Sequence, residues 1–139
     1  MKPKLTPQQL ELWDKVKEKI LTDPEHFDVD AVVDGEGAPC GTVCCIGGWA
    51  YVLTKGFPWH VEGVTWSSNS VLYKASEFLG IPVIEGVSPG SPVFYRSHWP
   101  LRFSRAYQAA NLDHDNPDRL KNRARVAVDY IDHWIATGE

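Results

Sequence analysis

The stretch Cys40-Gly-Thr-Val-Cys-Cys-Ile-Gly-Gly-Trp-Ala-Tyr-Val-Leu-Thr54 constrains the fold more than any other part of the sequence. It holds all three cysteines and the only Gly-Gly pair. Its apolar spacing predicts a helix that begins with Thr42 as the N-cap, runs to about Thr54 and ends at Gly56. Two glycines inside a helix cost roughly 1 kcal/mol each against alanine, and close packing against the backbone is the expected compensation. We therefore expect a buried central helix whose first turn carries the thiols.

Residues 5–21 carry the clearest helix signals outside this stretch. Thr6 is the predicted N-cap, Pro7 takes the first helical position, and Gln9 completes a capping box. Asp23-Pro24-Glu25 then predicts a short helical turn that Phe27 anchors. The predicted buried stripe of the helix, apolar except for one lysine stem, consists of Leu10, Trp13, Val16, Lys17, Ile20 and Leu21.

Three more helices are predicted further along the chain. One begins at Ser67 or Ser68 and ends before Gly80. The next runs over residues 100–111, and the last begins after Asp115 or Asn116 and continues to Gly138. The candidate core residues of the last two helices are Leu101, Phe103, Tyr107, Ala110, Leu120, Ala124, Ala127, Val128, Ile131 and Ile135.

The remaining segments are predicted as loops. Residues 82–100 are rich in proline and glycine, and we expect an ordered loop pinned by Val93, Phe94, Tyr95 and Trp99. A short hairpin turning at Glu62-Gly63 is compatible with residues 57–66. The predicted fold is a compact, mainly α single domain over residues 1–139, with about five helices, long ordered loops and at most one short hairpin.

Composition excludes several classes of protein. The 139 residues are 43% hydrophobic and include six tryptophans, which is typical of a folded globule. No apolar run approaches the roughly 20 residues of a membrane-spanning helix. The N-terminal lysines precede no apolar segment, so we expect no secretory signal. Three cysteines, two of them adjacent, do not form a disulfide framework, which favours a reducing cytoplasm.

The cysteine stretch also carries a family resemblance. A group of small uncharacterised bacterial and phage proteins has the core Cys-Gly-Thr-x-x-Cys-(Ile/Leu)-(Ala/Gly)-Gly-(Trp/His)-Ala, and it resembles the segment from Cys40 to Ala50. Other blocks of the group resemble Asp23-Pro-Glu-His-Phe-Asp28, Trp99-Pro100 and the segment from Tyr130 to Gly138. The resemblance implies a small single domain of bacterial or phage origin. It transfers no catalytic residue, because the group has no established activity.

Cys44 and Cys45 are candidate nucleophiles in an alternative interpretation. At a helix N-terminus, the dipole and the free N–H groups stabilise a thiolate and lower its pKa. Papain-like cysteine hydrolases place their nucleophile in this way. A partner histidine would come from His60 or His98, which both lie in irregular segments beside tryptophans. Against this, Cys45 lies on the predicted buried face, where a cysteine is usually an inert small hydrophobe.

No metal or other cofactor is predicted. Cys40 and Cys44 have the spacing of one pair of zinc ligands, but a second cysteine–histidine pair is missing. The acids of residues 28–36 do not fit an EF-hand, since positions 5 and 12 of that loop would be Val32 and Pro39. A solvated acidic loop is the expected structure.

Basic residues gather late in the chain, although the net charge is −4. Residues 96–125 hold six arginines, one lysine and three aspartates. Such a patch can bind phosphates. However, the pI is near 5.7, and cations at the start of the last helix oppose its dipole. We therefore expect a solvated face with ion pairs to the acidic N-terminal half, and no nucleic-acid site.

Aromatic residues in two irregular segments predict an interaction surface. Loops rich in glycine and proline cannot bury so many rings by periodic packing, and aromatics beside arginines have the composition of an interface centre. The candidate binding residues are Trp59, Trp66, Tyr95, Arg96, Trp99 and Arg102. We expect a small cytoplasmic accessory protein that binds a protein partner or self-associates, without catalysis and without membrane contact. The alternative is a cysteine-dependent hydrolase or transferase.

Overall fold

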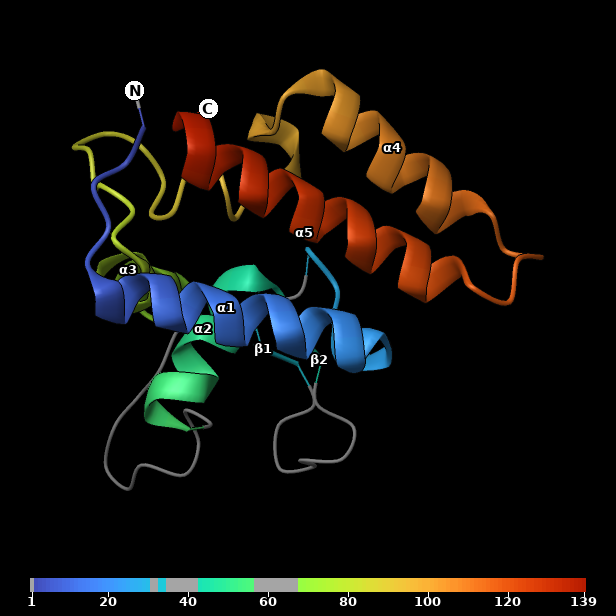
Figure 1. Ribbon diagram of the computed structural model, residues 1–139, viewed down its shortest axis with the longest axis horizontal. Helices are drawn as coiled ribbons and strands as arrows, with labels where there is room; N and C mark the ends of the chain where they lie inside the picture. The colour runs from blue at the N-terminus through green and yellow to red at the C-terminus, as the bar shows by residue number, and fades with distance from the viewer. Residues whose placement is uncertain (1, 31–32, 35–42, 57–67) are drawn as a thin grey trace.

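The computed structural model describes residues 2–30, 33–34, 43–56 and 68–139, and over these ranges the fold is mainly α-helical, as predicted (Figure 1). The α-helices of these ranges are α1 (Pro7–Thr22), α2 (Ile46–Lys55), α3 (Ser68–Leu79), α4 (Leu101–Leu112) and α5 (Arg119–Thr137). Two short 3-10 helices are η1 (Pro24–His26) and η4 (Arg96–His98). Two short strands, β1 (Val33–Asp34) and β2 (Val43–Cys44), pair antiparallel.

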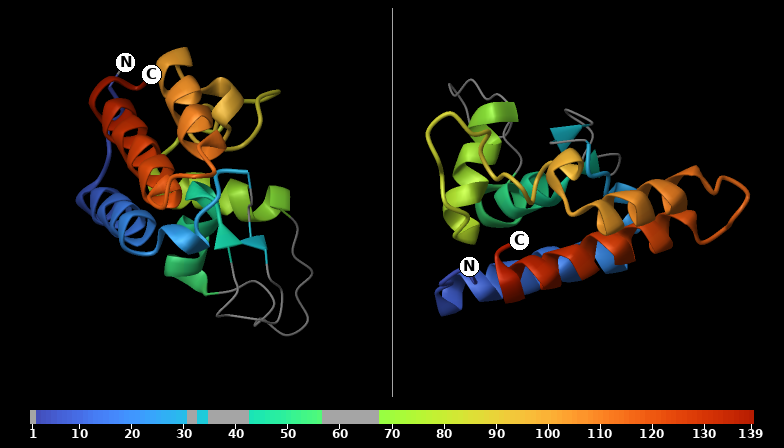
Figure 2. Two further views of the ribbon diagram at one scale, coloured as in Figure 1. Left: turned by 90° about the vertical axis from the view of Figure 1, so that its right-hand side faces the viewer. Right: turned by 90° about the horizontal axis from the view of Figure 1, so that it is seen from above.

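The α-helices are arranged as two packed pairs joined by α1. α4 packs against α5, α2 packs against α3, and α1 contacts α2, α3 and α5. α1 and α5 run side by side in opposite directions, and the two termini lie at the same end of the molecule (Figure 1, Figure 2). Buried side chains from each of the five α-helices of the described ranges belong to one hydrophobic cluster.

α1 begins as the sequence predicts, but it buries a narrower face. The Gln9 N–H donates to Thr6 Oγ1 at 3.1 Å, and the Thr6 N–H donates to Gln9 Oε1 at 2.9 Å, so the capping box is confirmed. The predicted stripe is too wide, because Leu10 and Leu21 at its edges are exposed. The fully buried side chains of α1 are Trp13, Val16 and Ile20.

The central helix begins later than predicted. α2 starts at Ile46 with Cys45 as its N-cap, so the start predicted at Thr42 is wrong, although Thr42 itself lies outside the described residues. Cys44 does not belong to the first helical turn, because its backbone is extended and pairs with β1. Its carbonyl also accepts a hydrogen bond from the Asp28 N–H at 3.1 Å. A backbone held in a strand pair cannot also open a helix.

The Gly-Gly pair of α2 is buried, and the expected close packing is present at Gly47. A Cβ atom on Gly47 would lie 2.6 Å from Leu72 Cδ2 and 2.9 Å from a ring carbon of Phe94. α3 and the loop that carries Phe94 therefore approach the α2 backbone in space that a side chain would fill.

The loop before α4 is ordered and is pinned by the predicted residues. Val93, Phe94 and Trp99 are buried, and Trp99 Nε1 donates to the Val93 carbonyl at 2.7 Å. The Phe94 ring lies directly over Gly90, where a side chain would overlap it. The hairpin predicted at Glu62-Gly63 lies outside the described residues.

The last two helices differ from prediction at their starts. Leu101 was predicted to be buried, but it is 61% exposed, whereas Tyr107 on the same helix is buried. α5 begins at Arg119, not directly after Asn116. The reason is that Asn116 Oδ1 accepts a hydrogen bond from the Asp118 N–H at 2.9 Å and closes a turn before the helix.

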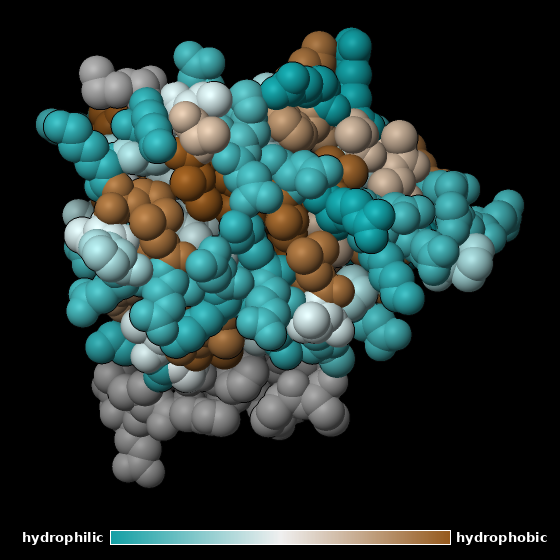
Figure 3. Space-filling view, viewed as in Figure 1, coloured by the Kyte–Doolittle hydropathy of each residue, from teal (hydrophilic) through white to brown (hydrophobic). Residues whose placement is uncertain are grey.

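The face that carries α1 and α5 is mainly polar. Hydrophilic residues cover most of it, and hydrophobic residues appear there in separate patches between them (Figure 3). The exposed apolar side chains of α1, Leu10 and Leu21, are eleven positions apart and do not form one continuous patch along the helix.

Candidate functional site

A pocket of about 350 Å³ lies where the start of α2, the middle of α3, η4 and α4 meet. Its apolar wall comes from four segments that are far apart in the sequence. Val29 follows η1, Cys45 caps α2, Leu72 lies on α3, and Phe94 lies on the loop before η4. All four side chains belong to the buried core. This apolar wall, called the floor of the pocket below, is therefore a part of the core surface.

Polar side chains surround this apolar floor. They are Asp30, Tyr95, Arg96, Ser97, Ser104 and Gln108. Ser104 and Gln108 are four residues apart on α4 and therefore share one helix face. Asp30 and Arg96 carry opposite charges. The uncharged side chains present three hydroxyl groups and one amide group. The pocket therefore combines an apolar floor with hydrogen-bonding groups of both kinds.

The two charged groups at the pocket are only loosely paired. Arg96 Nη2 lies 3.9 Å from Asp30 Oδ2, and the two side chains are 27% and 67% exposed. The Arg96 guanidinium also lies 5.6 Å from the centroid of the buried Tyr107 ring, within the range of a cation–π contact. Tyr107 therefore helps to fix the position of the arginine, while its charge remains accessible from the pocket.

Tyr95 stands beside the arginine and is partly exposed. Burial raises the pKa of its hydroxyl, and a hydrogen bond with Ser88 works in the opposite direction. At neutral pH the hydroxyl is therefore protonated and can donate or accept a hydrogen bond. An aromatic ring with one polar edge at a pocket rim is common in protein interfaces.

The thiols of Cys44 and Cys45 are buried and electrically neutral. Burial raises the pKa of Cys44 from 9.0 to about 12, and the neighbouring Cys45 adds to the shift. Burial also raises the pKa of Cys45 from 9.0 to about 11, against the effect of backbone hydrogen bonds from Gly48 and Gly47. The Gly48 N–H donates to Cys45 Sγ at 3.3 Å, so the sulfur acts as an N-cap acceptor. The raised pKa values argue against the alternative interpretation, in which the helix N-terminus lowers a thiol pKa, and they agree with the expectation that Cys45 is an inert buried thiol.

The predicted partner histidines do not complete a cysteine site within the described residues. His98 is exposed, and its Nδ1 lies 2.8 Å from Ser91 Oγ. His60 lies outside the described residues. A serine–histidine contact has the atoms of a nucleophile and its base. In the part of the chain that the structure describes, however, no carboxylate contacts His98, and its neighbouring ring is that of Tyr95 at 5.5 Å.

The predicted binding residues separate into three groups. Tyr95 and Arg96 meet at the pocket. Trp99, a candidate binding residue that was also expected to pin the loop, is 5% exposed, and its ring stacks on Tyr130 at 4.8 Å between centroids. Arg102 lies away from the pocket lining, with its guanidinium 3.1 Å from His133 Nδ1. The remaining predicted residues, Trp59 and Trp66, lie outside the described residues.

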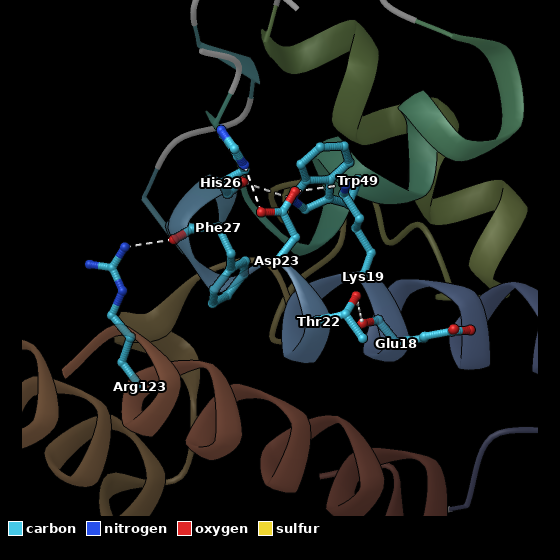
Figure 4. A network of polar contacts seen from close by, with 8 residues as sticks. All are labelled: Glu18, Lys19, Thr22, Asp23, His26, Phe27, Trp49 and Arg123. Atoms are coloured by element: carbon cyan, nitrogen blue, oxygen red, sulfur yellow. Dashed lines mark hydrogen bonds and ion pairs between the residues drawn. The ribbon is translucent and has the colours of Figure 1, made fainter. Parts of the chain in front are cut away.

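A second polar network ties the end of α1 to α2, as Figure 4 shows. Lys19 Nζ donates to the Asp23 carboxylate at 2.8 Å, and His26 Nδ1 lies 2.7 Å from the same group. Burial alone would raise the pKa of Asp23, but hydrogen bonds with Lys19 and His26 outweigh it and lower the pKa. Trp49 Nε1 donates to the His26 carbonyl at 3.0 Å, and Lys19 lies 4.7 Å from the centroid of the Trp49 ring. The network holds η1 between the two helices.

The environment of Arg123 differs from the one that the sequence predicts. Arg123 was predicted to lie on a solvated face, but it is only 8% exposed. Its Nη2 donates to the Phe27 carbonyl at 2.6 Å, and its Nη1 donates to Asn111 Oδ1 at 2.7 Å (Figure 4 shows the first bond). Within the described residues its Nε has no hydrogen-bond partner. The sequence did carry a signal for this burial. Arg123 precedes Ala127 by four residues and Tyr130 by seven, a spacing that puts all three on the buried face of α5.

The described ranges contain neither a metal site nor a membrane-spanning helix. There, no group of three or more His, Cys, Asp or Glu side chains is placed to hold a metal ion. No helix in those ranges is long and apolar enough to cross a membrane. A second hollow, of about 540 Å³, lies between α1, α2 and α3, and its lining includes Glu11, Lys15 and Leu53, which are all exposed.

The comparisons with known proteins identify no family. No protein-family model matches the sequence, no curated protein is significantly similar to it, and no solved structure matches its fold. The resemblance of the cysteine stretch to small bacterial and phage proteins therefore stays a prediction.

Proposed function

We propose that this is a small cytoplasmic accessory protein, of bacterial or phage origin, that acts by binding another protein through the pocket face. The pocket face is the surface around the 350 Å³ pocket, with Tyr95 and Arg96 at its rim. Cys44 and Cys45 are free thiols, which supports a reducing compartment. The resemblance of the cysteine stretch supports the origin.

One observation carries the proposal: Tyr95 and Arg96 are adjacent, partly exposed and placed beside an apolar floor. Tyrosine and arginine are enriched among the residues that dominate binding energy, and they act best around a central apolar depression that excludes water. Tyr107 beneath the guanidinium limits the motion of Arg96, so less entropy is lost when a partner binds.

A cysteine-dependent hydrolase or transferase is the second candidate, because Cys45 lines the same pocket. Such chemistry needs the thiolate, and a pKa of about 11 leaves very little of it at neutral pH. Binding a partner would have to lower the pKa by several units, or bring a base within hydrogen-bond distance, before the sulfur became a nucleophile. The binding function needs no such change.

The test is quantitative affinity capture from a lysate of the source cells, read out by mass spectrometry. Tyr95→Ser and Arg96→Ala should each reduce the recovery of a specific partner by at least about fivefold, as expected for interface-centre residues. Tyr73→Ser and Arg105→Ala are matched controls, since both residues are exposed and lie outside the pocket. Capture that does not change in either pocket variant would refute the proposal.

Self-association is tested separately by sedimentation velocity on the purified protein. A dimer that dissociates in Tyr95→Ser but not in Tyr73→Ser would make a second copy of the chain the partner. A monomer at all concentrations, together with lysate capture that depends on Tyr95 and Arg96, would make the partner a different protein.

A further inference from the structure

We propose that the pocket binds the C-terminal residue of a partner polypeptide, a proposal that rests on the proposed function. The free carboxylate would pair with Arg96, and an apolar side chain would lie on the floor formed by Leu72 and Phe94. Three features of the pocket support this ligand: its loosely paired cation, the single carboxylate among its described lining residues, and its size.

Arg96 has capacity for a second carboxylate. A charge-assisted hydrogen bond between a guanidinium and a carboxylate is usually about 2.7–2.9 Å long. The distance from Arg96 to Asp30 is 3.9 Å, which is a contact between charges without a hydrogen bond. Among the described residues no other carboxylate pairs with Arg96. A ligand carboxylate can therefore form the bidentate contact that Asp30 does not form.

The other polar groups of the pocket favour an anion as well. The Ser97 and Ser104 hydroxyls and the Gln108 amide can donate hydrogen bonds to an anion as well as accept them, and none of them carries a negative charge. Asp30 is the only carboxylate among the described lining residues, and it stands at the exposed rim. Asp30 can accept a backbone N–H of the ligand, while Arg96 pairs with the ligand carboxylate.

The volume fits one residue at the end of a chain. A pocket of 350 Å³ lies at the small end of the range for ligand sites, roughly 300–1,000 Å³, so it takes a small group and not a long peptide segment. A C-terminal residue carries its carboxylate, its side chain and its N–H on a single Cα, so all three can reach different walls of a pocket of this size. The floor of Val29, Leu72 and Phe94 offers only apolar contact, which selects an apolar side chain.

A free apolar amino acid has the same carboxylate but also an ammonium group. That ammonium group would compete with Arg96 for Asp30, the one carboxylate among the described lining residues, which already contacts the arginine. An amide N–H needs only one acceptor and carries no charge. The geometry therefore favours the polypeptide over the free amino acid.

The experiment measures fluorescence anisotropy of labelled hexapeptides that end in leucine, with either a free carboxylate or an amide. The free acid should bind wild type, and amidation should weaken binding by about ten- to a hundredfold, because a hydrogen-bonded charge is lost. Arg96→Ala should weaken binding of the free-acid peptide by a similar factor and leave binding of the amide peptide unchanged. Arg96→Lys should recover part of the lost affinity for the free acid. Arg105→Ala should match wild type.

A second measurement needs no variant at the arginine. With wild-type protein, adding the free-acid peptide should shift the NMR signals of the Leu72 and Val29 methyl groups, and the amide should not shift them at the same concentration. N-acetylleucine should compete with the peptide, and free leucine should compete at least about tenfold less well, because of the cost of placing its ammonium group.

Three results would overturn the inference: equal binding of acid and amide, methyl shifts located elsewhere, or leucine competing better than N-acetylleucine. The last result would assign the pocket to a free amino acid. These failures are distinct from failure of the proposed function. Lysate capture that still depends on Tyr95 and Arg96 would keep the partner-binding role and reject only the C-terminal carboxylate.

Discussion

Native Cys45 should be alkylated far more slowly than a free cysteine. Only the thiolate reacts, and its population falls tenfold for each unit by which the pKa exceeds the pH. With a pKa of about 11, Cys45 has roughly 300-fold less thiolate near neutral pH than an exposed cysteine of pKa about 8.5. For Cys44, with a pKa of about 12, the factor is roughly 3000. Both sulfurs are also almost inaccessible to solvent, which slows the reaction further.

The assay is iodoacetamide labelling near neutral pH, followed by intact-mass spectrometry. A Cys40→Ser variant restricts the signal to the two buried thiols. The same variant in concentrated guanidinium chloride gives the reference rate of the unfolded chain. We expect a native rate at least about a hundredfold below that reference. A native rate within about tenfold of the reference would refute the assigned burial and pKa, and it would favour the cysteine-dependent enzyme.

Four further changes test the packing and electrostatics. Gly47→Ala should destabilise the fold by about 1–2 kcal/mol, since the new Cβ would lie 2.6 Å from Leu72 Cδ2, and an unchanged or higher midpoint in urea would contradict the packing. Trp99→Ala should cost about 3–5 kcal/mol in the same assay, and a change below about 1 kcal/mol would place the ring at the surface. Arg123→Met should weaken the fold by about 1–3 kcal/mol, because the Phe27 carbonyl and Asn111 lose their donor, whereas the exposed Arg125→Met should have little effect. The pKa of Asp23 is lowered, so its contribution to stability is complete above about pH 4 and is lost as the pH falls through the folded-state pKa. Asp23→Asn should therefore make the stability less dependent on pH below about 4. Identical acid unfolding curves for the variant and wild type would reject the ion network.

Much of the fold follows from signals that lie within a few residues of one another. The capping box of Thr6 and Gln9 sets the start of α1, and it is present with both hydrogen bonds. Gly138, with φ of 79°, ends α5 in the left-handed conformation that favours glycine. Such signals act through the local backbone, so the sequence alone is enough to locate them.

The errors have a different origin, since each depends on a contact between distant segments. The start of α2 moved because the Cys44 backbone pairs with residues that precede it by ten positions or more. Trp99 is buried because α5 brings Tyr130 against its ring. Arg123 is buried because the Phe27 carbonyl, 96 residues earlier, accepts its hydrogen bond. Periodicity along one helix does not report these partners.

The candidate site was predictable only in part. Tyr95 and Arg96 were identified from their composition, and they do meet at the pocket. Asp30 was considered only as a calcium ligand, and Ser104 and Gln108 carried no signal, because serine and glutamine on a helix are usually solvated. What makes them part of one site is the packing of α4 against the start of α2, which only the tertiary structure specifies.

Hydrogen–deuterium exchange of the protein bound to its captured partner locates the interaction surface. We expect slower exchange in the complex at η4 and over the first two turns of α4, which carry Arg96, Ser97 and Ser104. The exposed face of α1 beside Glu11 and Lys15 should exchange at the same rate in the free and bound protein. Slower exchange confined to α1, with η4 and α4 unchanged, would refute binding at the pocket face and assign the interaction surface to α1.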